Sequence, residues 1–382
     1  MAFQFISMKE VYGISSNVCS PLGLNTSAVW SSVIDGQSGI NTEFDPSLLD
    51  RQIPISRFSQ EQLESIGTIV DPQGLSRLEQ LALFSAKEAF HHCSTPLDLS
   101  RTLFVLSTTK GNIDELEQGD VQRNRLSNSA AIIAKKLGIP GKAVVISHAC
   151  ISGLSSLMYG MRRLQHGDYS SVVIVGVDIL SRFVISGFAS FMALSNHPCR
   201  PFDLKRDGIN LGEAAATMIL SLDPGQTPLA MLSGASTSND ANHISGPSRT
   251  GAELALAISR AIQEARIESK DIAAISAHGT ATLYNDEMEA KAYALANLLH
   301  APVHSLKGYF GHTLGAAGVL ESVLLVESLR RGLIIPSAGF DTLGVSEAVK
   351  ISKHAESRYI EHALKTASGF GGCNAALVWS RA

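Results

Sequence analysis

Short, almost continuous apolar runs alternate with a longer helical pattern in the first half of the chain. Residues 142–147 (KAVVIS) and 171–179 (SVVIVGVDI) have the unbroken apolar character of buried strands. Between them, residues 153–165 carry an apolar stripe at helical spacing. Such strands are typical of a parallel sheet that helices cover on both faces. The pattern therefore predicts an α/β architecture.

The second half repeats this alternation. The same criteria predict helices over residues 250–266 and 286–299, and strands over residues 229–235, 272–277, 303–306 and 375–379. Residues 222–228 (LDPGQTP) place two prolines and a glycine between the two sets. We therefore divide the chain into an N-terminal half, residues 1–226, and a C-terminal half, residues 227–382.

Composition narrows the function classes. Lys plus Arg number 31 and Asp plus Glu 35, a net charge of −4, and a general nucleic-acid binder would carry a basic excess. Charged residues are only 17% of the chain, which hints at surface buried against another subunit. The five cysteines are odd in number and form no C-x-x-C pair, which argues against a disulfide framework or a cysteine zinc site.

The sequence shows no targeting or membrane segment. Residues 1–10 have no basic stretch followed by a long apolar run, so we expect no signal peptide. No apolar run approaches the roughly 18 residues that a membrane span needs. A reducing, cytoplasmic setting is expected.

Cys150 is the first candidate for chemistry. It follows the strand predicted at residues 142–147 and precedes Ser152 and Gly153, where the next helix begins. The positive end of a helix dipole and free backbone N–H groups favour a thiolate and predict a lowered pKa. The glycine would permit a sharp strand-to-helix turn. A small buried structural cysteine is the alternative.

Three glycine-containing segments of the second half carry further candidates. His278 lies in HGTAT at the end of the strand predicted at residues 272–277, where α/β sheets usually bind ligands. His312 lies with Lys307 in SLKGYFGHTLGAAG, residues 305–318, where small residues permit close approach. GFGGCN, residues 369–374, precedes the last predicted strand. Taken alone, His278 is also compatible with a structural histidine, residues 305–318 with tight helix packing, and GFGGCN with a plain turn.

Taken together, these features form a recognisable order. The two histidines follow Cys150 by 128 and 162 residues, and the glycine loop follows them. The chain resembles the β-ketoacyl-acyl-carrier-protein synthases, condensing enzymes of the thiolase superfamily, almost end to end. The motifs that carry the resemblance are SPLG (20–23), DGQSGI (35–40), AC (149–150), RPFD (200–203), RDG (206–208), GE (212–213), HGTAT with Asn285, Asp286 and Glu289, the Lys307–His312 segment, and GFGGCN.

The resemblance implies a thiolase-like fold with two similar halves in a five-layered αβαβα sandwich. It implies a decarboxylative Claisen condensation of an enzyme-bound acyl group with malonyl-acyl carrier protein, in fatty-acid or specialised polyketide or polyene biosynthesis. The partners would be the carrier protein and a second subunit, as a homodimer or as a heterodimer with a related chain. No metal and no organic cofactor would be needed, because the carrier brings its own phosphopantetheine arm.

The resemblance also implies a role for each matching residue. Cys150 would be the acyl-accepting nucleophile, and His278 and His312 would stabilise the enolate formed by decarboxylation. Lys307 would keep histidine neutral, with Glu289 as its ion-pair partner. The remaining assignments are Thr280 and Thr282 for the phosphopantetheine arm, and Phe370 for gating the acyl pocket and, through its backbone N–H with that of Cys150, for the second oxyanion.

Two alternatives remain open, and so does the docking surface. A non-catalytic chain-length-factor-like subunit would lack the cysteine. A thiolase acting on coenzyme A thioesters would need a second cysteine as base, for which Cys373 is the candidate. His148 and Ile151 flank Cys150 where relatives have small or hydroxylated residues, so acyl-chain length is open. Because carrier proteins are acidic, we expect a basic patch, with Lys205, Arg206, Arg162 and Arg163 as its candidate members.

Overall fold

The computed structural model describes residues 9–382 except 118, 120 and 243–245. Residues 1–8, most of the segment used for the signal-peptide prediction, lie outside the described residues. Among the helices that the structure describes, none combines the length and the apolar character that crossing a bilayer requires.

The first half builds a mixed sheet of five strands. Three neighbouring strands are parallel: β5 (Val144–Ile146), β4 (Thr102–Ser107) and β6 (Ser171–Asp178). β8 (Ala214–Ser221) then pairs antiparallel with β6, and β1 (Tyr12–Cys19) pairs antiparallel with β8. β4, β6 and β8 are buried along their whole length, as their apolar runs require.

The second half repeats this strand pattern. The parallel strands here are β13 (Lys350–Ile351), β11 (Pro302–His304), β10 (Ile272–Ser276) and β15 (His362–Gly369), followed by the antiparallel β16 (Cys373–Ser380) and β9 (Ala230–Asn239). The two halves join where β1 pairs with β9, at Tyr12–Met231 and Gly13–Ala230, into one 11-stranded sheet. By position, β11 corresponds to β5 and β10 to β4.

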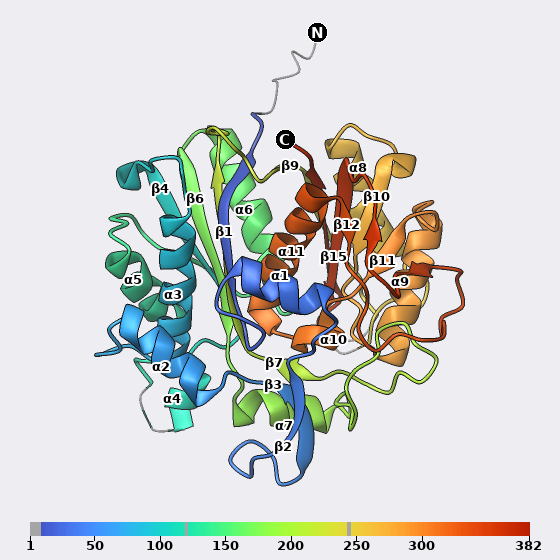
Figure 1. The fold of residues 1–382 in the computed structure, drawn as a ribbon, viewed down its shortest axis with the longest axis horizontal. Coiled ribbons are helices and arrows are strands. Elements are labelled where there is room, and N and C mark those ends of the chain that lie inside the picture. Colours follow the sequence, from blue (N-terminus) through green and yellow to red (C-terminus); the bar gives the residue numbers. More distant parts are fainter. Residues whose placement is uncertain (1–8, 118, 120, 243–245) are drawn as a thin grey trace.

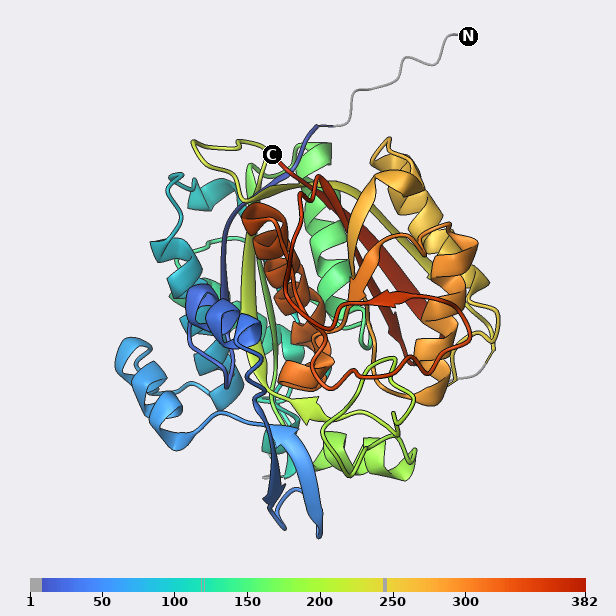
Figure 2. The same ribbon diagram turned by 45° about the vertical axis from the view of Figure 1, so that its right-hand side comes forward.

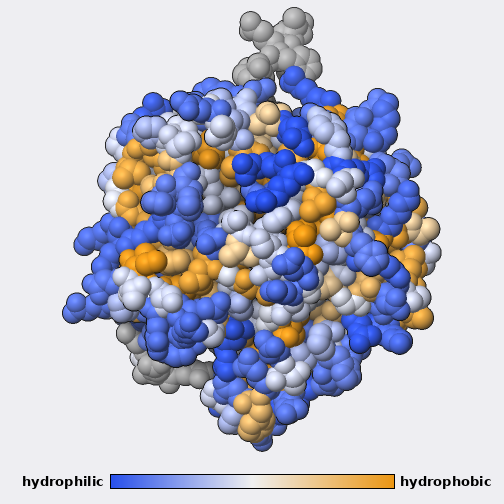
Figure 3. Space-filling view, in the orientation of Figure 1, coloured by the Kyte–Doolittle hydropathy of each residue, from blue (hydrophilic) through white to orange (hydrophobic). Residues whose placement is uncertain are grey.

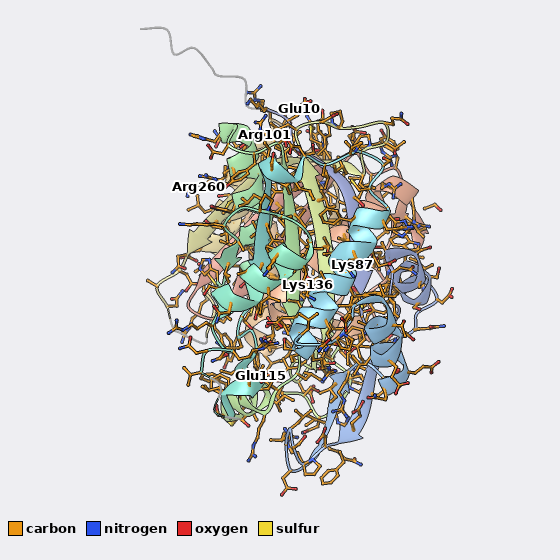
Figure 4. The ribbon with its side chains drawn as sticks, turned by 90° about the vertical axis from the view of Figure 1, so that its left-hand side faces the viewer. Glu10, Lys87, Arg101, Glu115, Lys136 and Arg260 are labelled. Atoms are coloured by element: carbon orange, nitrogen blue, oxygen red, sulfur yellow. The ribbon has the colours of Figure 1, made fainter. Side chains whose placement is uncertain are left out.

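Although β1 and β9 join them, the strands of the two halves stack as two separate layers, called the two sheets below, and helices form three layers around them (Figures 1 and 2). α6 (Ser152–His166) and α11 (Ala317–Arg331) lie between the halves, and their apolar side chains share one core with both sheets. α2 (Gln60–Ile69), α3 (Arg77–His91) and α5 (Leu126–Lys136) cover the outer face of the first half; Lys87 and Lys136 mark α3 and α5 in Figure 4. α8 (Ala252–Glu264) and α9 (Leu283–Leu295) cover the second half. The five-layered αβαβα prediction is confirmed.

The remaining elements are short. They are α1 (Thr26–Ile34), β2 (Ile40–Phe44), β3 (Gln52–Ser56), the 3₁₀ turn Leu99–Arg101, α4 (Ile113–Glu117), α7 (Arg182–Ser190), β7 (Leu211–Gly212), the 3₁₀ turn Ser269–Asp271, α10 (Lys307–Phe310), the 3₁₀ turn Leu314–Ala316, β12 (Leu333–Ile334) and β14 (Glu356–Ser357). β2, β3 and β7 form a separate small sheet, and with α7 they lie at the lower end of the molecule in Figure 1.

The central helices lie unusually close together at their N-terminal ends. A Cβ built on Gly153 of α6 would lie 2.7 Å from the Cα of Gly318 of α11. α11 is buried from Ala317 to Leu329, so it is largely apolar on every side, as a helix enclosed between two sheets must be. This contact brings together the chain segments that precede the two helices.

Most predicted elements of the interior are present with shifted ends. The helix predicted at residues 153–165 is α6, and the strand predicted at residues 171–179 is β6. The segment 142–147 was predicted to be buried, but only Val144–Ile146 is a strand and each of its residues is partly exposed, because β5 is the outer strand of the first half. The boundary between residues 226 and 227 stays a prediction.

One face of the surface is visible in Figure 3. In that view hydrophobic residues form small patches among hydrophilic side chains, over both halves of the molecule. The low charged share therefore does not produce one large apolar area on this side.

Candidate active site

Cys150 lies in the turn between β5 and α6. The turn is made by Ala149, whose φ of 45° lies in the left-handed region. The Ala149 carbonyl accepts hydrogen bonds from the backbone N–H and the hydroxyl of Ser152, which close the turn onto the helix. The prediction that Gly153 makes the sharp turn is wrong: Gly153 lies inside α6 and permits the contact with Gly318.

The Cys150 thiol is buried, and burial dominates its acidity. Burial raises the pKa of Cys150 to about 11, although hydrogen bonding with the Phe370 backbone and the nearby Lys307 ammonium both lower it. The pKa lowering predicted from the helix terminus alone is therefore wrong for the unliganded site. The thiol is therefore protonated at neutral pH.

His278 follows β10 directly and is held through its backbone. One Glu289 oxygen accepts the backbone N–H of His278 at 2.8 Å, and the other accepts that of Gly279 at 2.6 Å. The imidazole is buried, and its pKa lies well below the ordinary value, first because of burial and then because of the positive charge of Lys307. The ring is therefore neutral.

His312 lies between α10 and the 3₁₀ turn Leu314–Ala316, just before α11. Its backbone N–H donates to the Asn210 carbonyl at 2.7 Å, and its Nδ1 accepts the backbone N–H of Leu314 at 3.3 Å. Burial and the charge of Lys307 hold its pKa well below the ordinary value. With Nδ1 as an acceptor, the neutral ring carries its proton on Nε2. His312 Nε2 is buried without a hydrogen-bond partner among the described residues, so this N–H is available to a ligand.

The three side chains share one pocket. Cys150, His278 and His312 each offer an atom within 4.8 Å of the other two, and the two rings are 5.2 Å apart at 83°. The pocket encloses about 350 Å³ and is lined by all three. Ile151, in contrast, is fully buried in the core between the sheets. A thiol therefore faces two neutral imidazoles.

The predicted ion pair of Lys307 with Glu289 is wrong. Lys307 is fully buried, and its ammonium pairs with Oε1 of Glu321 on α11. Glu289 is instead occupied by the His278 and Gly279 backbone and by the side chains of Asn285, Tyr293 and Thr366. The sequence pattern did not identify Glu321, although a lone glutamate in the apolar run around it could have indicated a buried ion pair.

A second lysine joins this ion pair. Lys365 of β15 is fully buried, and its Nζ lies 2.9 Å from Oε2 of Glu321. The sequence analysis did not identify Lys365 either. Lysines are rarely buried without a partner, so a lysine within a predicted buried strand could have indicated an ion pair.

Thr280, Thr282 and Phe370 all line the same pocket as the catalytic candidates. The two threonine hydroxyls lie 2.9 Å apart. The Phe370 ring stacks on Phe188 and meets Phe191 edge-on, with both centroid distances at 5.5 Å. These aromatic rings form one apolar side of the pocket mouth.

The four candidate members of a basic patch do not form one. Lys205 is exposed, but Arg206 is buried and donates to backbone carbonyls of Asp203 and Gly344. Arg162 and Arg163 lie toward the other end of α6, about 18 Å of helix away from Cys150. There they pair with Glu264 and Asp168 respectively, so the predicted grouping is wrong.

Family models and solved structures identify relatives of this chain. The model of the β-ketoacyl synthase N-terminal domain matches residues 8–223, and that of the C-terminal domain matches residues 229–341. A 3-oxoacyl-[acyl-carrier-protein] synthase 2 of Mycobacterium leprae is 28% identical, over 94% of this chain and 93% of the relative.

Two solved structures have the same fold. A ketosynthase of Xenorhabdus doucetiae, in complex with its chain length factor, is 24% identical with a TM-score of 0.86, and the match covers 100% of both chains. A type II polyketide synthase complex of an acyl-carrier protein with its ketosynthase gives 23% identity and a TM-score of 0.87, over 98% of this chain and 99% of the other.

Proposed function

The chain belongs to the β-ketoacyl synthase family of acyltransferases, and on that premise we propose that it condenses an acyl group on Cys150 with malonyl-acyl carrier protein, with loss of carbon dioxide. The observation that carries the proposal is the convergence of a buried thiol and two neutral imidazoles in one pocket. In the proposed reaction the thiol accepts the acyl group, and the two imidazoles stabilise the enolate.

Acyl transfer is the first step. The Cys150 sulfur attacks the thioester carbonyl of an acyl carrier, the carrier thiol leaves, and the cysteine proton ends on that thiol. Both the nucleophile and the leaving group are thiols, so the free-energy change of the thioester exchange is close to zero. Hydrogen bonding from the backbone at Phe370 and at Cys150 itself stabilises the negative sulfur.

Decarboxylation is the second step. The bond between the malonyl carboxylate and its methylene carbon breaks, carbon dioxide leaves, and the electron pair forms an enolate on the thioester oxygen. The Nε2–H of His312 and an N–H of His278 donate to that oxygen. A donor aimed at developing charge contributes about 3 kcal/mol to lowering the barrier. Burial and the Lys307 charge keep both rings neutral. A neutral His312 can accept the Leu314 N–H on Nδ1, which orients its Nε2–H, whereas an imidazolium would lose this contact.

Carbon–carbon bond formation completes the cycle. The enolate carbon attacks the carbonyl of acyl-Cys150, the bond to sulfur breaks, and the thiolate takes up a proton. The oxyanion formed in this step lies near the backbone N–H groups of Cys150 and Phe370. No metal or organic cofactor takes part in this scheme, and the phosphopantetheine arm passes Thr280 and Thr282.

We further propose that the protein works with a carrier protein and a second ketosynthase-fold chain. Solved relatives form complexes with a chain length factor and with an acyl-carrier protein. β5, which leads to Cys150, is the outer strand of its half and is partly exposed, as a strand that pairs with another chain would be. The proposal includes a homodimer or a heterodimer, a fatty-acid or a polyketide pathway, and a cytoplasmic location.

Intact-protein mass spectrometry after incubation with a panel of acyl carriers tests the proposal. The expected result is one acyl adduct, absent in Cys150→Ala, and an extended β-ketoacyl carrier after malonyl carrier is added. Acylation and elongation by Cys150→Ala would end the proposal. If the wild-type protein takes no acyl group from any carrier, the alternative of a non-catalytic partner subunit is favoured. The presence of the cysteine and both histidines counts against that alternative, because a non-catalytic subunit would not need them.

A further inference from the structure

The buried ammonium of Lys365 connects the segment that carries His278 with Glu321. Lys365 pairs with Ser276 in the register of β15 and β10. Its Nζ donates to the carbonyls of Ser276 at 3.0 Å, Ala277 at 3.1 Å and Thr366 at 2.6 Å. Ser276 and Ala277 are the two residues directly before His278. The lysine therefore holds the backbone from which the His278 ring projects.

These contacts require the charged form of the lysine. Three carbonyl oxygens accept hydrogen bonds from Nζ, and a neutral amine has only two N–H groups. The fourth neighbour is Oε2 of Glu321, at 2.9 Å. Because Oε1 of the same carboxylate pairs with Lys307, two buried ammonium groups share a single carboxylate. This ion triad carries one positive charge in excess.

From this geometry we propose that Lys365 is a positioning residue for both histidines: it fixes the end of β10 and supplies the excess positive charge that keeps the two rings neutral. The inference rests on the proposed function, because neutral N–H donors matter for enolate stabilisation. It assigns a role to a side chain that touches neither the pocket nor the substrate.

The surrounding charges agree with this role. After burial and Lys307, the charge of Lys365 is a further cause that lowers the pKa of His278 and of His312. The other ionisable groups that face Lys365 are Glu289 and His304. Glu289 is directed at the backbone N–H groups of His278 and Gly279, and His304 is itself buried with a pKa of about 3. Lys365 is thus a second buried cation acting on the rings.

Lys365→Gln tests the charge, because the amide retains two donors for the carbonyls. We expect malonyl-carrier decarboxylation to change little at neutral pH, where both rings stay neutral, and to fall under acidic conditions, about tenfold for each unit by which the ring pKa rises. We also expect the acid limb of the rate profile to move to higher pH, since rings without the second cation protonate more readily. Acyl transfer to Cys150 should fall much less. Lys291→Gln, which alters a half-exposed lysine paired with Glu287, is the matched control and should change neither rate.

Histidine NMR titration separates this inference from the proposed function. His278 and His312, assigned through single His→Asn variants, should stay neutral at lower pH in the wild type than in Lys365→Gln. If the wild type shows no condensation but this difference appears, the proposed function fails and the charge role stands. Identical titration curves together with an unmoved acid limb would overturn the inference.

If Lys365→Gln does not fold, Lys365→Ala leaves a cavity lined by three carbonyls and a carboxylate. Ammonium ions should then raise its thermal stability and its decarboxylation rate, while sodium at equal ionic strength should not. No response of either quantity to ammonium would also overturn the role of Lys365.

Discussion

Gly153 and Gly318 meet with no side chain between them: a Cβ added to Gly153 would lie 2.7 Å from the Gly318 Cα and 2.7 Å from the Val319 nitrogen. Cys150 comes just before Gly153, and His312 comes six residues before Gly318. Cys150 and His312 are therefore close because α6 and α11 touch at their N-terminal ends. Packing at the centre of the fold therefore determines how close Cys150 and His312 lie.

Gly153→Ala should therefore damage both stability and chemistry. Overpacking of this kind costs about 1–3 kcal/mol of unfolding free energy, and relief by helix separation would draw Cys150 away from His312. We expect a lower melting temperature and a larger loss in condensation than in Cys150 acylation. Gly67→Ala is the control, because a Cβ on Gly67 of α2 meets nothing within 4 Å and should be neutral or stabilising. Equal melting temperatures for Gly153→Ala and wild type would contradict the packing argument.

The carboxylate partner of Lys307 can be identified by double-mutant cycles. Lys307 pairs with Glu321, and Glu289 binds backbone N–H groups, so Lys307→Met should couple strongly to Glu321→Gln and weakly to Glu289→Gln. Losing one partner of a buried ion pair costs about 3–5 kcal/mol. Urea unfolding of the single and double variants measures both couplings. A coupling to Glu289 that exceeds the coupling to Glu321 would restore the pairing expected from the sequence.

Lys307 and Glu321 show which contacts cannot be predicted from the sequence. Motifs such as HGTAT place His278 at a strand end because strand, loop and helix are neighbours in the chain, and the alternating apolar runs predict the layers in the same local way. The Lys307–Glu321 pair joins two different helices, α10 and α11, across 14 residues of chain. Lys365 reaches the triad from β15, next to β10 in space but 89 residues from Ser276 in the chain. Contacts of this kind depend on tertiary packing, which no local pattern encodes.

The acidity of Cys150 is a second case in which packing outweighs a local rule. The helix terminus favours a thiolate, but burial raises the pKa of the thiol to about 11. Alkylation of the unliganded enzyme by iodoacetamide should therefore rise with pH, about tenfold per unit across the neutral range, and level off only near pH 11. Mass spectrometry of the labelled Cys150 peptide measures the rate. A plateau beginning near pH 7 would mean that the thiolate is already stabilised at rest.

A substitution of Cys373 distinguishes the synthase hypothesis from the thiolase hypothesis. Its thiol lies near Cys150, because a Cβ on Gly369 would meet both the Cys373 sulfur at 2.9 Å and the Cys150 nitrogen at 3.0 Å. Burial raises the pKa of Cys373 to about 12, with a further upward contribution from Cys150, so it is a poor base at neutral pH. Cys373→Ser should retain condensation within about threefold, a change of under 1 kcal/mol in the barrier. A loss of several orders of magnitude with intact acylation would indicate a thiolase-like base.

Cys150, His278 and His312 also have the chemistry of zinc ligands, so metal ions can be used to test the proposed mechanism. One thiol and two neutral imidazoles with ligand atoms within 4.8 Å of one another resemble a Cys–His₂ site after small adjustments. Zinc bound there would take the Cys150 sulfur and the histidine nitrogens that the proposed reaction needs. We therefore expect micromolar zinc to inhibit acylation, prior acylation of Cys150 to protect the enzyme, and EDTA to leave the untreated rate unchanged. Steady-state rates with and without EDTA, and zinc titration of the free and the acylated enzyme, measure this. If EDTA abolished activity and zinc restored it, the trio would be a metal centre, and the two-imidazole mechanism would be wrong.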